Sequence, residues 1–554
     1  MVRSNNTGVA SLALISVLLG GCLGGVDSDD NTAVIVAEEP VLNCQSTMDE
    51  TLFANPEELR ALMTKLISHG ELRTTGSEAE QQVIDWVETE LQSYGGFEIT
   101  SQEMTIPRWQ PIPDDPDGAG RSLALAGQLS IEGTSVPVAG AVPFSLPTDQ
   151  TGMSGELVYV PNDQPIGPEH AGKVILRDIP KVIIPNAYLT ADAFYLAPDR
   201  VAEAASGYYI RPYLSGGAMH QDMILAGQAG AMGVVFAFDV PREQVEGYFD
   251  PHNGTIYHVP AVFVGVDEAE QLKAAANGAT VANVSVQAER DTATTRNLIA
   301  RLPGESDERL VFFTNTDGNT WVQDNGVVGM LALAKYFSAF PEECRSRTIE
   351  LAFTTGHLQM SVDGSKSYIK SLDEQHDDGT VALAFALEHL GAKEILPVPR
   401  DNAPGNELQL TGKPESTTWF VAEGHDSMAD IVIDALQAHD VSSMNVLPGV
   451  IPKTQTHPTY CSFGGIGTYG HTQLVPSMAI ISGPWSLWAP SFGEEAIDFE
   501  QMHKQLLAVG DVTLRLDDLT REEIAGPYLA WREARAEGGP VCPLGDESPA
   551  VAPL

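Results

Sequence analysis

Apolar and polar residues follow two different periodicities along the central part of the chain. Short continuous apolar runs at 310–313, 349–353 and 381–387 are bounded by polar residues, which predicts buried strands. Over 327–340 the apolar residues recur at three- and four-residue spacing, which predicts a helix between the first two strands. Strands that alternate with helices indicate an α/β fold, and we expect a mixed sheet with flanking helices in three layers.

Polar residues follow the first two predicted strands. Asn315-Thr316-Asp317 follows the first strand, Asp324 precedes the helix, and His357 follows the second strand. Ligands of open α/β sheets bind outside the carboxyl ends of the strands. We therefore expect any chemistry of this protein near Asn315, Asp317, Asp324 and His357.

Further elements are predicted on both sides of this centre. We expect helices over 56–68, 77–94, 365–371, 428–438 and 499–516, and strands over 97–106 and 478–482. Ser77 and Glu80 predict a capping box at the start of the second helix. The apolar stripe of that helix is Val83, Trp86, Val87 and Leu91. From 114 to 288 the chain is instead rich in Gly, Pro and Val, with many short predicted strands. Within it, Pro180–Gly216 is expected to be an extra loop over the cleft.

The charge of the chain excludes some partners. Lysine and arginine number 31 against 75 aspartate and glutamate residues, so the formal net charge is 31 − 75 = −44. A surface this negative repels nucleic acid and anionic lipid headgroups. We interpret the acidity as an adaptation to solubility or salt, not as an acidic binding site.

The N-terminal segment predicts export. Arg3 precedes a short apolar run at 9–19, which is too short to span a bilayer as a helix. Leu19-Gly20-Gly21-Cys22 resembles the bacterial lipoprotein cleavage box, so Cys22 is expected to carry the lipid; an ordinary signal peptide is the alternative. Because Leu23 is not the aspartate that favours inner-membrane retention, we expect an outer-membrane anchor, and 22–50 as an acidic tether.

Four cysteines follow Cys22, and an exported protein can keep disulfides. Their positions along the chain favour the pairs Cys44–Cys542 and Cys344–Cys461, with free thiols as the alternative. None has CxxC spacing, which disfavours a cysteine zinc site.

The central stretch resembles the zinc-dependent aminopeptidase family that includes the glutamate carboxypeptidase-like and transferrin-receptor-like proteins. The resemblance rests on Asn315-Thr316-Asp317, Asp324-Asn325, Gly356-His357-Leu358 and Gly364-Ser365, and on the Arg-x-x-Gly-Ser stretch at 73–77. It implies a peptidase-like domain at 51–113 and 289–530, interrupted at 114–288 by a β-rich domain similar to the protease-associated domain. A signal peptide at 1–21 and a tail at 531–554 complete the expected organisation.

The resemblance implies two zinc ions, but several expected reactive residues differ. The first histidine ligand falls on Asn315, whose amide is a poor zinc ligand, while its orienting aspartate is present as Asp317. The bridging aspartate is Asp324, and a further carboxylate ligand corresponds to Glu388. The Glu-Glu pair that supplies the general base and a ligand falls on His357-Leu358. No histidine follows the last predicted strand before His503.

Two functions stay open on this sequence. The first is a non-catalytic envelope protein that binds a peptide or protein, or serves as a scaffold, with a largely lost zinc site. The alternative is a diverged metallopeptidase with one metal held by Asp324, Glu388 and His357, completed by His389 or His471. There is no Gly-x-Ser-x-Gly elbow, phosphate loop or dinucleotide fingerprint.

Overall fold

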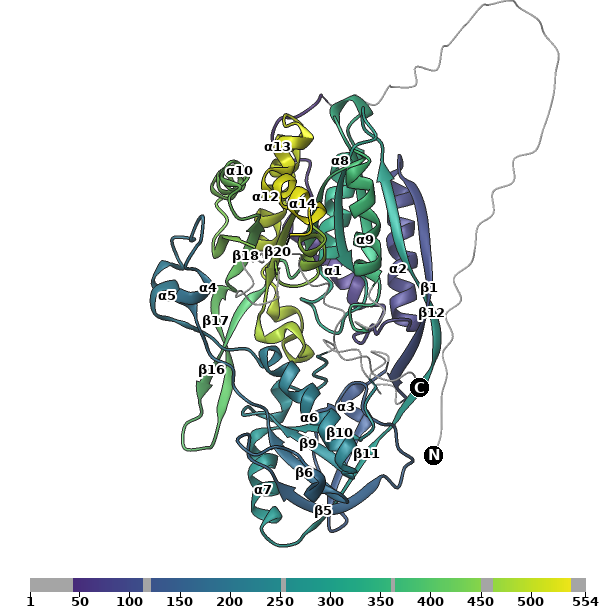
Figure 1. Ribbon diagram of the computed structural model, residues 1–554, viewed down its shortest axis with the longest axis vertical. Helices are drawn as coiled ribbons and strands as arrows, with labels where there is room; N and C mark the ends of the chain where they lie inside the picture. The colour runs from purple at the N-terminus through teal and green to yellow at the C-terminus, as the bar shows by residue number, and fades with distance from the viewer. Residues whose placement is uncertain (1–42, 113–120, 251–255, 360–363, 450–461, 540–554) are drawn as a thin grey trace, which may run out of the picture. The chain divides into compact units, whose positions relative to one another are not determined.

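The computed structural model describes residues 43–112, 121–250, 256–359, 364–449 and 462–539 (Figure 1). The predicted signal peptide, Cys22, Cys461 and Cys542 lie outside these ranges. None of the helices within them combines the length and the apolar character that a bilayer span requires.

An eight-stranded mixed sheet forms the larger part of the fold. In spatial order its strands are β1 (Glu98–Pro111), β12 (Ala288–Leu302), β14 (Thr348–Thr354), β13 (Arg309–Asn315), β15 (Val381–Leu387), β20 (Ser477–Ser482), β18 (Thr417–Val421) and β19 (Met444–Pro448). The four central strands, from β14 to β20, run parallel, whereas β1 and β12 are antiparallel to their neighbours. The predicted open α/β sheet with mixed strand directions is therefore confirmed.

Helices cover both faces of this sheet because its strands are apolar on both sides. In β13, Leu310 and Phe312 pack in one hydrophobic cluster, while Val311 and Phe313 pack in another. The first face carries α1 (Pro56–Ile67), α2 (Glu78–Tyr94), α8 (Gly326–Ser338), α10 (Asp426–Ala438) and α12 (Phe499–Leu516). The second face carries α9 (Gly364–Asp377), α11 (Gly467–Thr472) and α14 (Pro527–Ala536), with α13 (Arg521–Ala525) leading from α12 to α14. The three-layer α/β architecture is confirmed, and α14 extends into the segment predicted as a tail.

A second eight-stranded sheet is formed within the range predicted as an insertion. Its order is β3 (Thr134–Val136), β2 (Gly127–Ile131), β11 (Val281–Val286), β5 (Met153–Tyr159), β6 (Lys173–Asp178), β9 (Gly233–Ala237), β10 (Ala261–Val264) and β4 (Gly140–Ala141). It packs with α3 (Leu123–Ala126), α6 (Gly216–Ala229) and α7 (Val266–Ala276). Strands β1 and β12 pair without interruption from Glu98↔Arg301 to Pro111↔Ala288 and run from one sheet towards the other (Figure 1).

Two smaller features complete the described fold; the first was not expected from the sequence, and the second lies within the range 180–216 that was expected to be an extra loop. A hairpin of β16 (Lys393–Pro399) and β17 (Asn406–Pro414) extends from the large sheet. The segment 184–214, which we call the arm, contains β7 (Ile184–Pro185), α4 (Asn186–Leu189), α5 (Val201–Ser206) and β8 (Tyr208–Tyr209).

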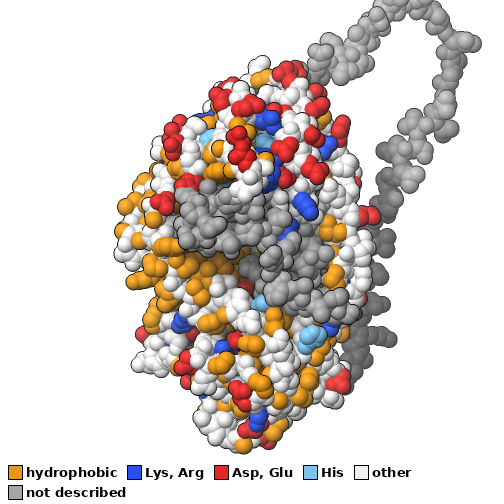
Figure 2. All heavy atoms as spheres, viewed as in Figure 1, with side chains coloured by type: hydrophobic (Ala, Val, Ile, Leu, Met, Phe, Trp, Pro, Cys, Tyr) orange, Lys and Arg blue, Asp and Glu red, His pale blue; other side chains and the backbone are white. Residues whose placement is uncertain are grey.

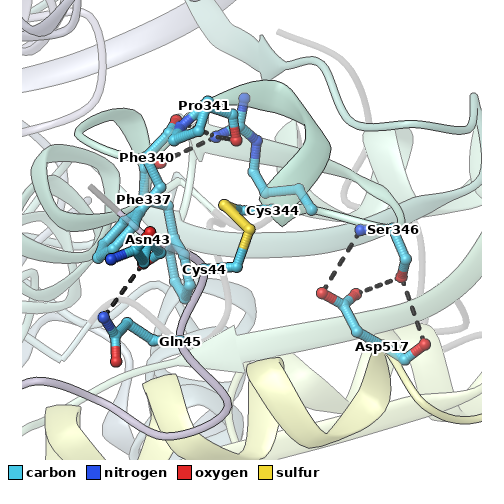
Figure 3. The surroundings of a disulfide bond; sticks show 10 residues. Asn43, Cys44, Gln45, Phe337, Phe340, Pro341, Cys344, Ser346 and Asp517 are labelled. Carbon is cyan, nitrogen blue, oxygen red and sulfur yellow. Dashed lines mark hydrogen bonds between the residues drawn. A yellow bond between two sulfur atoms is a disulfide. The ribbon is translucent and has the colours of Figure 1, made fainter. Parts of the chain in front are cut away.

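The predicted disulfide pairing is wrong for the described cysteines. Cys44 is bonded to Cys344, with their Cα atoms 4.9 Å apart (Figure 3). The chain after Cys44 runs along α8 and α12, where the Met48 and Asp49 amides donate to Asp511 and to the Tyr336 hydroxyl. This course brings Cys44 to the turn after α8. The expected Cys44–Cys542 pair relied on both cysteines lying near the ends of the sequence. The packing of the segment after Cys44 against α8 and α12 decides instead which cysteine it meets.

Candidate functional site

The carboxyl end of β13 holds two buried polar side chains predicted to belong to the site. Asn315 is the last residue of β13 and is fully buried, and neither its amide nitrogen nor its amide oxygen has a hydrogen-bond partner among the described residues. Asp317 is also fully buried. Its carboxylate accepts hydrogen bonds from the Thr75 hydroxyl (2.6 Å) and from the backbone amides of His357 (3.1 Å) and Leu358 (2.7 Å). Asp317 thus joins the loops after β13 and β14 instead of orienting a histidine ligand.

Glu80 of α2 is a buried carboxyl of this region that was expected only as a cap. The Ser77 hydroxyl accepts from the Glu80 amide, but the Glu80 carboxyl accepts from the Gly76 amide (2.6 Å) and not from that of Ser77. The hydroxyls of Thr295, Thr316 and Thr355 also donate to it. The predicted capping box is therefore only half formed. A signal was present, because Glu80 lies three residues before Val83, on the stripe predicted to be buried.

Burial raises the pKa of both carboxyls. For Glu80, removal from water and then the charge of Asp317 raise the pKa to about 8, although its hydroxyl and amide donors oppose the shift. For Asp317, burial raises the pKa to about 6 against the Thr75 hydroxyl and the two loop amides. At neutral pH the protonated form of Glu80 is favoured, which limits the negative charge stored beside β13.

Asp324 is held by Arg73, a residue to which the sequence assigned no role. Nε of Arg73 donates to Oδ2 of Asp324 (2.8 Å) and Nη2 donates to Oδ1 (2.7 Å), and both side chains are fully buried. The other guanidinium N–H groups donate to the carbonyls of Gly70, Glu71 and Thr320. All five N–H donors of Arg73 therefore have acceptors. Both oxygens of the predicted bridging ligand point at a fixed cation.

Glu388 and His389 follow β15 and line the cavity that is described below. The Glu388 Oε2 atom accepts from the Ile466 amide (2.8 Å), and its Oε1 atom lies 3.9 Å from Nε2 of His389. Nδ1 of His389 donates to the Ser482 carbonyl (2.5 Å), and its backbone has φ 56°. The His357 ring stacks on Trp488 with centroids 5.9 Å apart. These three predicted residues are brought to one cavity.

His471, by contrast, is a core residue. Its ring stacks on Phe463 at 4.0 Å between centroids, and its Nδ1 lies 2.8 Å from the Tyr528 hydroxyl. It is fully buried in α11 and is absent from the described lining of the cavity. The structure therefore gives His471 a packing role.

The residues present do not fit the predicted metal sets. Within the described parts of the chain, no three histidine, cysteine, aspartate or glutamate side chains gather as a metal site requires. Arg73 already takes both Asp324 oxygens, and the amide of Asn315 replaces the expected imidazole. Among the residues that the structure describes, neither a two-zinc centre nor the set of Asp324, Glu388 and His357 is assembled.

A cavity of about 690 Å³ lies beside the carboxyl ends of β15 and β20 and along the strands β18 and β19, which run in the opposite direction. His357, Glu388 and His389 line it on the side of the large sheet. Aromatic residues contribute much of the remaining wall: Tyr188, Tyr208, Tyr209, Tyr213, Phe420 and Trp488. The arm forms the opposite side, as expected for an extra loop over the cleft. Cavities of this size and lining hold small ligands or parts of larger ones.

Two buried ion pairs fasten the arm to the β16–β17 hairpin and to the residue that leads from this hairpin into β18. Arg211 donates to Glu415 (2.5 Å) and to the Gly483 carbonyl (2.7 Å), and Arg200 donates to Glu394 (2.5 Å). Burial raises the pKa of Glu415, while the Arg211 guanidinium opposes that shift. Gly483 lacks a side chain where a Cβ would collide with the hydroxyls of Tyr209 and Tyr213. The backbone of Tyr195 also pairs with Val446 of the edge strand β19. The arm is thus a fixed wall of the cavity.

Comparison with known proteins places this geometry on a known fold. No family model matches the chain, and no curated protein matches its sequence. Among solved structures, the chain is similar to BSAP, a zinc aminopeptidase from Bacillus subtilis, with a TM-score of 0.57 and 14% identity over 85% of this chain and 98% of that one. It is also similar to a peptidase M28 precursor from Shewanella amazonensis SB2B, with a TM-score of 0.55 and 16% identity over 85% and 98% of the two chains.

A third similar structure is an aminopeptidase from Aneurinibacillus sp. strain AM-1, with a TM-score of 0.53 and 16% identity over 84% of this chain and 94% of that one. The chain has the fold of zinc aminopeptidases. At this identity the likeness shows the fold alone, so the chemistry of the site depends on the residues described above.

Proposed function

We propose that this protein is a non-catalytic member of the zinc-aminopeptidase fold that binds a peptide or protein segment. One observation carries the proposal: the Arg73 guanidinium takes both carboxylate oxygens of Asp324, the residue in the position of the bridging metal ligand. A metal ion at that carboxylate would have to displace the guanidinium or lie beside its positive charge. In a fully buried site that repulsion is weakly screened, so cation binding there is disfavoured.

The cavity supports the binding part of the proposal. Its wall combines aromatic and aliphatic side chains with a few polar groups, which is the usual composition of ligand sites. It opens at the carboxyl ends of parallel strands, where α/β proteins bind their ligands. The fixed arm makes the cavity preformed, which lowers the ordering cost of binding.

We also propose that the protein acts in the cell envelope, anchored through Cys22. The support is the Leu-Gly-Gly-Cys stretch after a short apolar run. Expressed in a bacterial host, the native chain is expected in the membrane fraction and the Cys22→Ser variant in the soluble fraction. Equal partition of the two chains would contradict the anchor without touching the ligand proposal.

Metal content tests the non-catalytic assignment. The purified, untagged chain is incubated with excess zinc, desalted and assayed by elemental analysis beside Asp324→Ala and Glu388→Gln. We expect no metal in the native chain above that in the two variants, and no release of amine from aminoacyl-anilide substrates. About one metal per chain, lost in either variant and accompanied by hydrolysis, would instead establish the alternative, a diverged metallopeptidase. That alternative draws support from the convergence of His357, Glu388 and His389 on the cavity.

A further inference from the structure

The arm and the two residues that precede it expose an unusual concentration of apolar side chains. Of the fourteen large hydrophobic side chains that are exposed among the described residues, six lie between 182 and 208. They are Val182, Ile183, Tyr188, Leu189, Val201 and Tyr208, with exposed fractions from 37% to 77%. Figure 2 shows hydrophobic side chains gathered at the left of this face, where Figure 1 places α4 and α5. We call these six residues the arm patch. In a chain with a net charge of −44, an exposed apolar surface of this kind marks an interaction site.

The arm patch is continuous with the cavity. Tyr188, Leu189 and Tyr208 belong to both, because they line the cavity and are also exposed on the arm. The other three patch residues, Val182, Ile183 and Val201, are absent from the described cavity lining, although Ile184, Arg200 and Glu203 beside them belong to it. A ligand that fills the cavity can therefore also reach the exposed apolar side chains of the arm patch.

The charges around the cavity exclude acidic ligands. Its described lining includes five carboxylates: Asp192, Glu203, Glu388, Glu415 and Glu423. Its arginines are Arg200 and Arg211, and both are paired with glutamates. An anionic ligand would thus face several carboxylates without an uncommitted guanidinium in this lining. Neutral and basic ligands are favoured.

Small polar residues favour a peptide over an acyl chain as the occupant. Ser416, Thr418, Asn445, Ser462 and Ser482 line the cavity together with its aromatic residues. Asn445 already bonds to the Ala197 amide and to Ser416, and Ser482 donates to the His389 carbonyl. Hydroxyl oxygens keep further acceptor capacity, which the amides of a peptide backbone can use and an acyl chain cannot.

We propose that the cavity and the arm patch together bind one extended peptide segment that is rich in aromatic and aliphatic residues and poor in acidic ones. This rests on the proposed function and specifies its ligand. One part of the segment occupies the cavity, and the following residues lie along the arm patch. The arm is then the element that selects sequence beyond the cavity.

Isothermal titration calorimetry with blocked synthetic peptides tests the proposal on the full chain. The long probe has about ten residues of leucine, phenylalanine and lysine, which when extended reach about 35 Å. The short probe is its central tripeptide, and an acidic probe replaces each lysine by glutamate. We expect the native chain to bind the long probe at least tenfold more tightly than the acidic probe or the short one.

The informative variant is Ile183→Ser with Val201→Ser, since both side chains are about half exposed and lie outside the described cavity lining. This variant should bind the long probe about tenfold more weakly, a loss typical of removing two apolar contacts. Its affinity for the short probe should equal that of the native chain. Val281→Ser with Leu529→Ser removes comparably exposed apolar side chains elsewhere and is the control. It should change the affinity for neither the long nor the short probe.

The outcomes separate the two proposals. Binding of the short probe with no effect of the arm variant on the long one would overturn the arm patch while preserving the cavity as a ligand site. Failure of every peptide to bind would overturn both. Tighter binding of a neutral monoacylglycerol, in competition with the long probe, would assign the surface to acyl chains. A dimer in sedimentation equilibrium that the arm variant dissociates would assign the patch to a second copy.

Discussion

Arg73 and Asp324 form a two-pronged ion pair, with Nε–Oδ2 and Nη2–Oδ1 separations of 2.8 and 2.7 Å, between elements 251 residues apart. Both side chains are inaccessible to water. In a zinc aminopeptidase fold this pair puts a permanent organic cation against a carboxylate that the resemblance assigns to metal binding. The pair also joins the loop between α1 and α2 to the loop before α8.

Removing one member of this pair should be more harmful than removing both. Arg73→Met leaves a buried carboxylate without its cation, and we expect a loss of about 3–5 kcal/mol in the free energy of unfolding. Arg73→Met with Asp324→Leu removes the uncompensated charge, so its thermal unfolding midpoint should lie above that of the single variant. A double variant that melts below the single one would show that the pair is not the main determinant of local stability.

The pH dependence of stability should report Glu80. Its folded-state pKa of about 8 lies above the ordinary 4.5, so the folded chain holds a proton that the unfolded chain has lost between these values. Stability contributed by this carboxyl is complete below about pH 4.5 and is lost as the pH rises through 8. Because one pKa unit corresponds to about 1.4 kcal/mol, we expect the unfolding midpoint to fall clearly between pH 5 and 8.

Glu80→Gln keeps this position neutral at every pH, so its midpoint should fall less over the same interval. Glu78→Gln is the matched control, because Glu78 lies two residues earlier in the same helix and is exposed. Its unfolding midpoint should fall with pH as steeply as that of the native chain. Parallel pH profiles of all three chains, measured by thermal unfolding, would contradict a protonated Glu80.

The disulfide can be mapped directly. Non-reducing proteolysis and mass spectrometry should yield a peptide pair containing Cys44 and Cys344. The cross-link closes a sequence separation of 300 residues, so Cys44→Ser with Cys344→Ser should lower the free energy of unfolding by about 2–4 kcal/mol. Recovery of Cys44 linked to Cys542 would restore the pairing first expected from the sequence.

The arm should detach locally when its inner ion pair is broken. Arg211→Leu leaves Glu415 buried and without its partner, so we expect protease cleavage within 184–214 at concentrations that spare the native chain. The unfolding transition of the remainder should persist. Arg242→Leu removes ion pairs to Glu243, Glu246 and Glu268 from a partly exposed position outside the arm. Exposed pairs of this kind are worth about 0.5 kcal/mol each, so this variant should not alter the cleavage pattern. If the arm resists the protease equally in the native chain and in both variants, backbone pairing alone is enough to hold this segment.

Segments with a strong local pattern could be predicted from the sequence. The strand at 381–387 and the helix at 499–516 occur with the predicted bounds, because one is apolar throughout and the other has a clear helical period. The β16–β17 hairpin was not predicted, and the arm was expected only as an extra loop, because the structure of both segments depends on partners far away in sequence. Glu415 lies about two hundred residues from Arg211, and no local period announces their contact.

The same limit applies to the candidate site. Of the strand-end residues expected at the site, His357 lines the cavity, as does Glu388, whereas Asn315, Asp317 and Asp324 are absent from its described lining. The partner of Asp324 was hidden, because an arginine before Thr-Thr-Gly-Ser carries no sign of which carboxylate it will reach. Bonds fixed only by tertiary packing, such as Arg73–Asp324 and Cys44–Cys344, have no signature in one sequence.

The continuous β1–β12 ribbon has an evolutionary consequence. The chain departs for the small sheet after Pro111 and returns at Ala288, and these two residues are direct partners across the ribbon. A short turn joining them would convert the ribbon into an ordinary hairpin and leave the large sheet intact. A single recombination event could therefore add or delete the intervening segment, and every deletion of this kind would strip the arm from the cavity and discard its selectivity together with the small sheet.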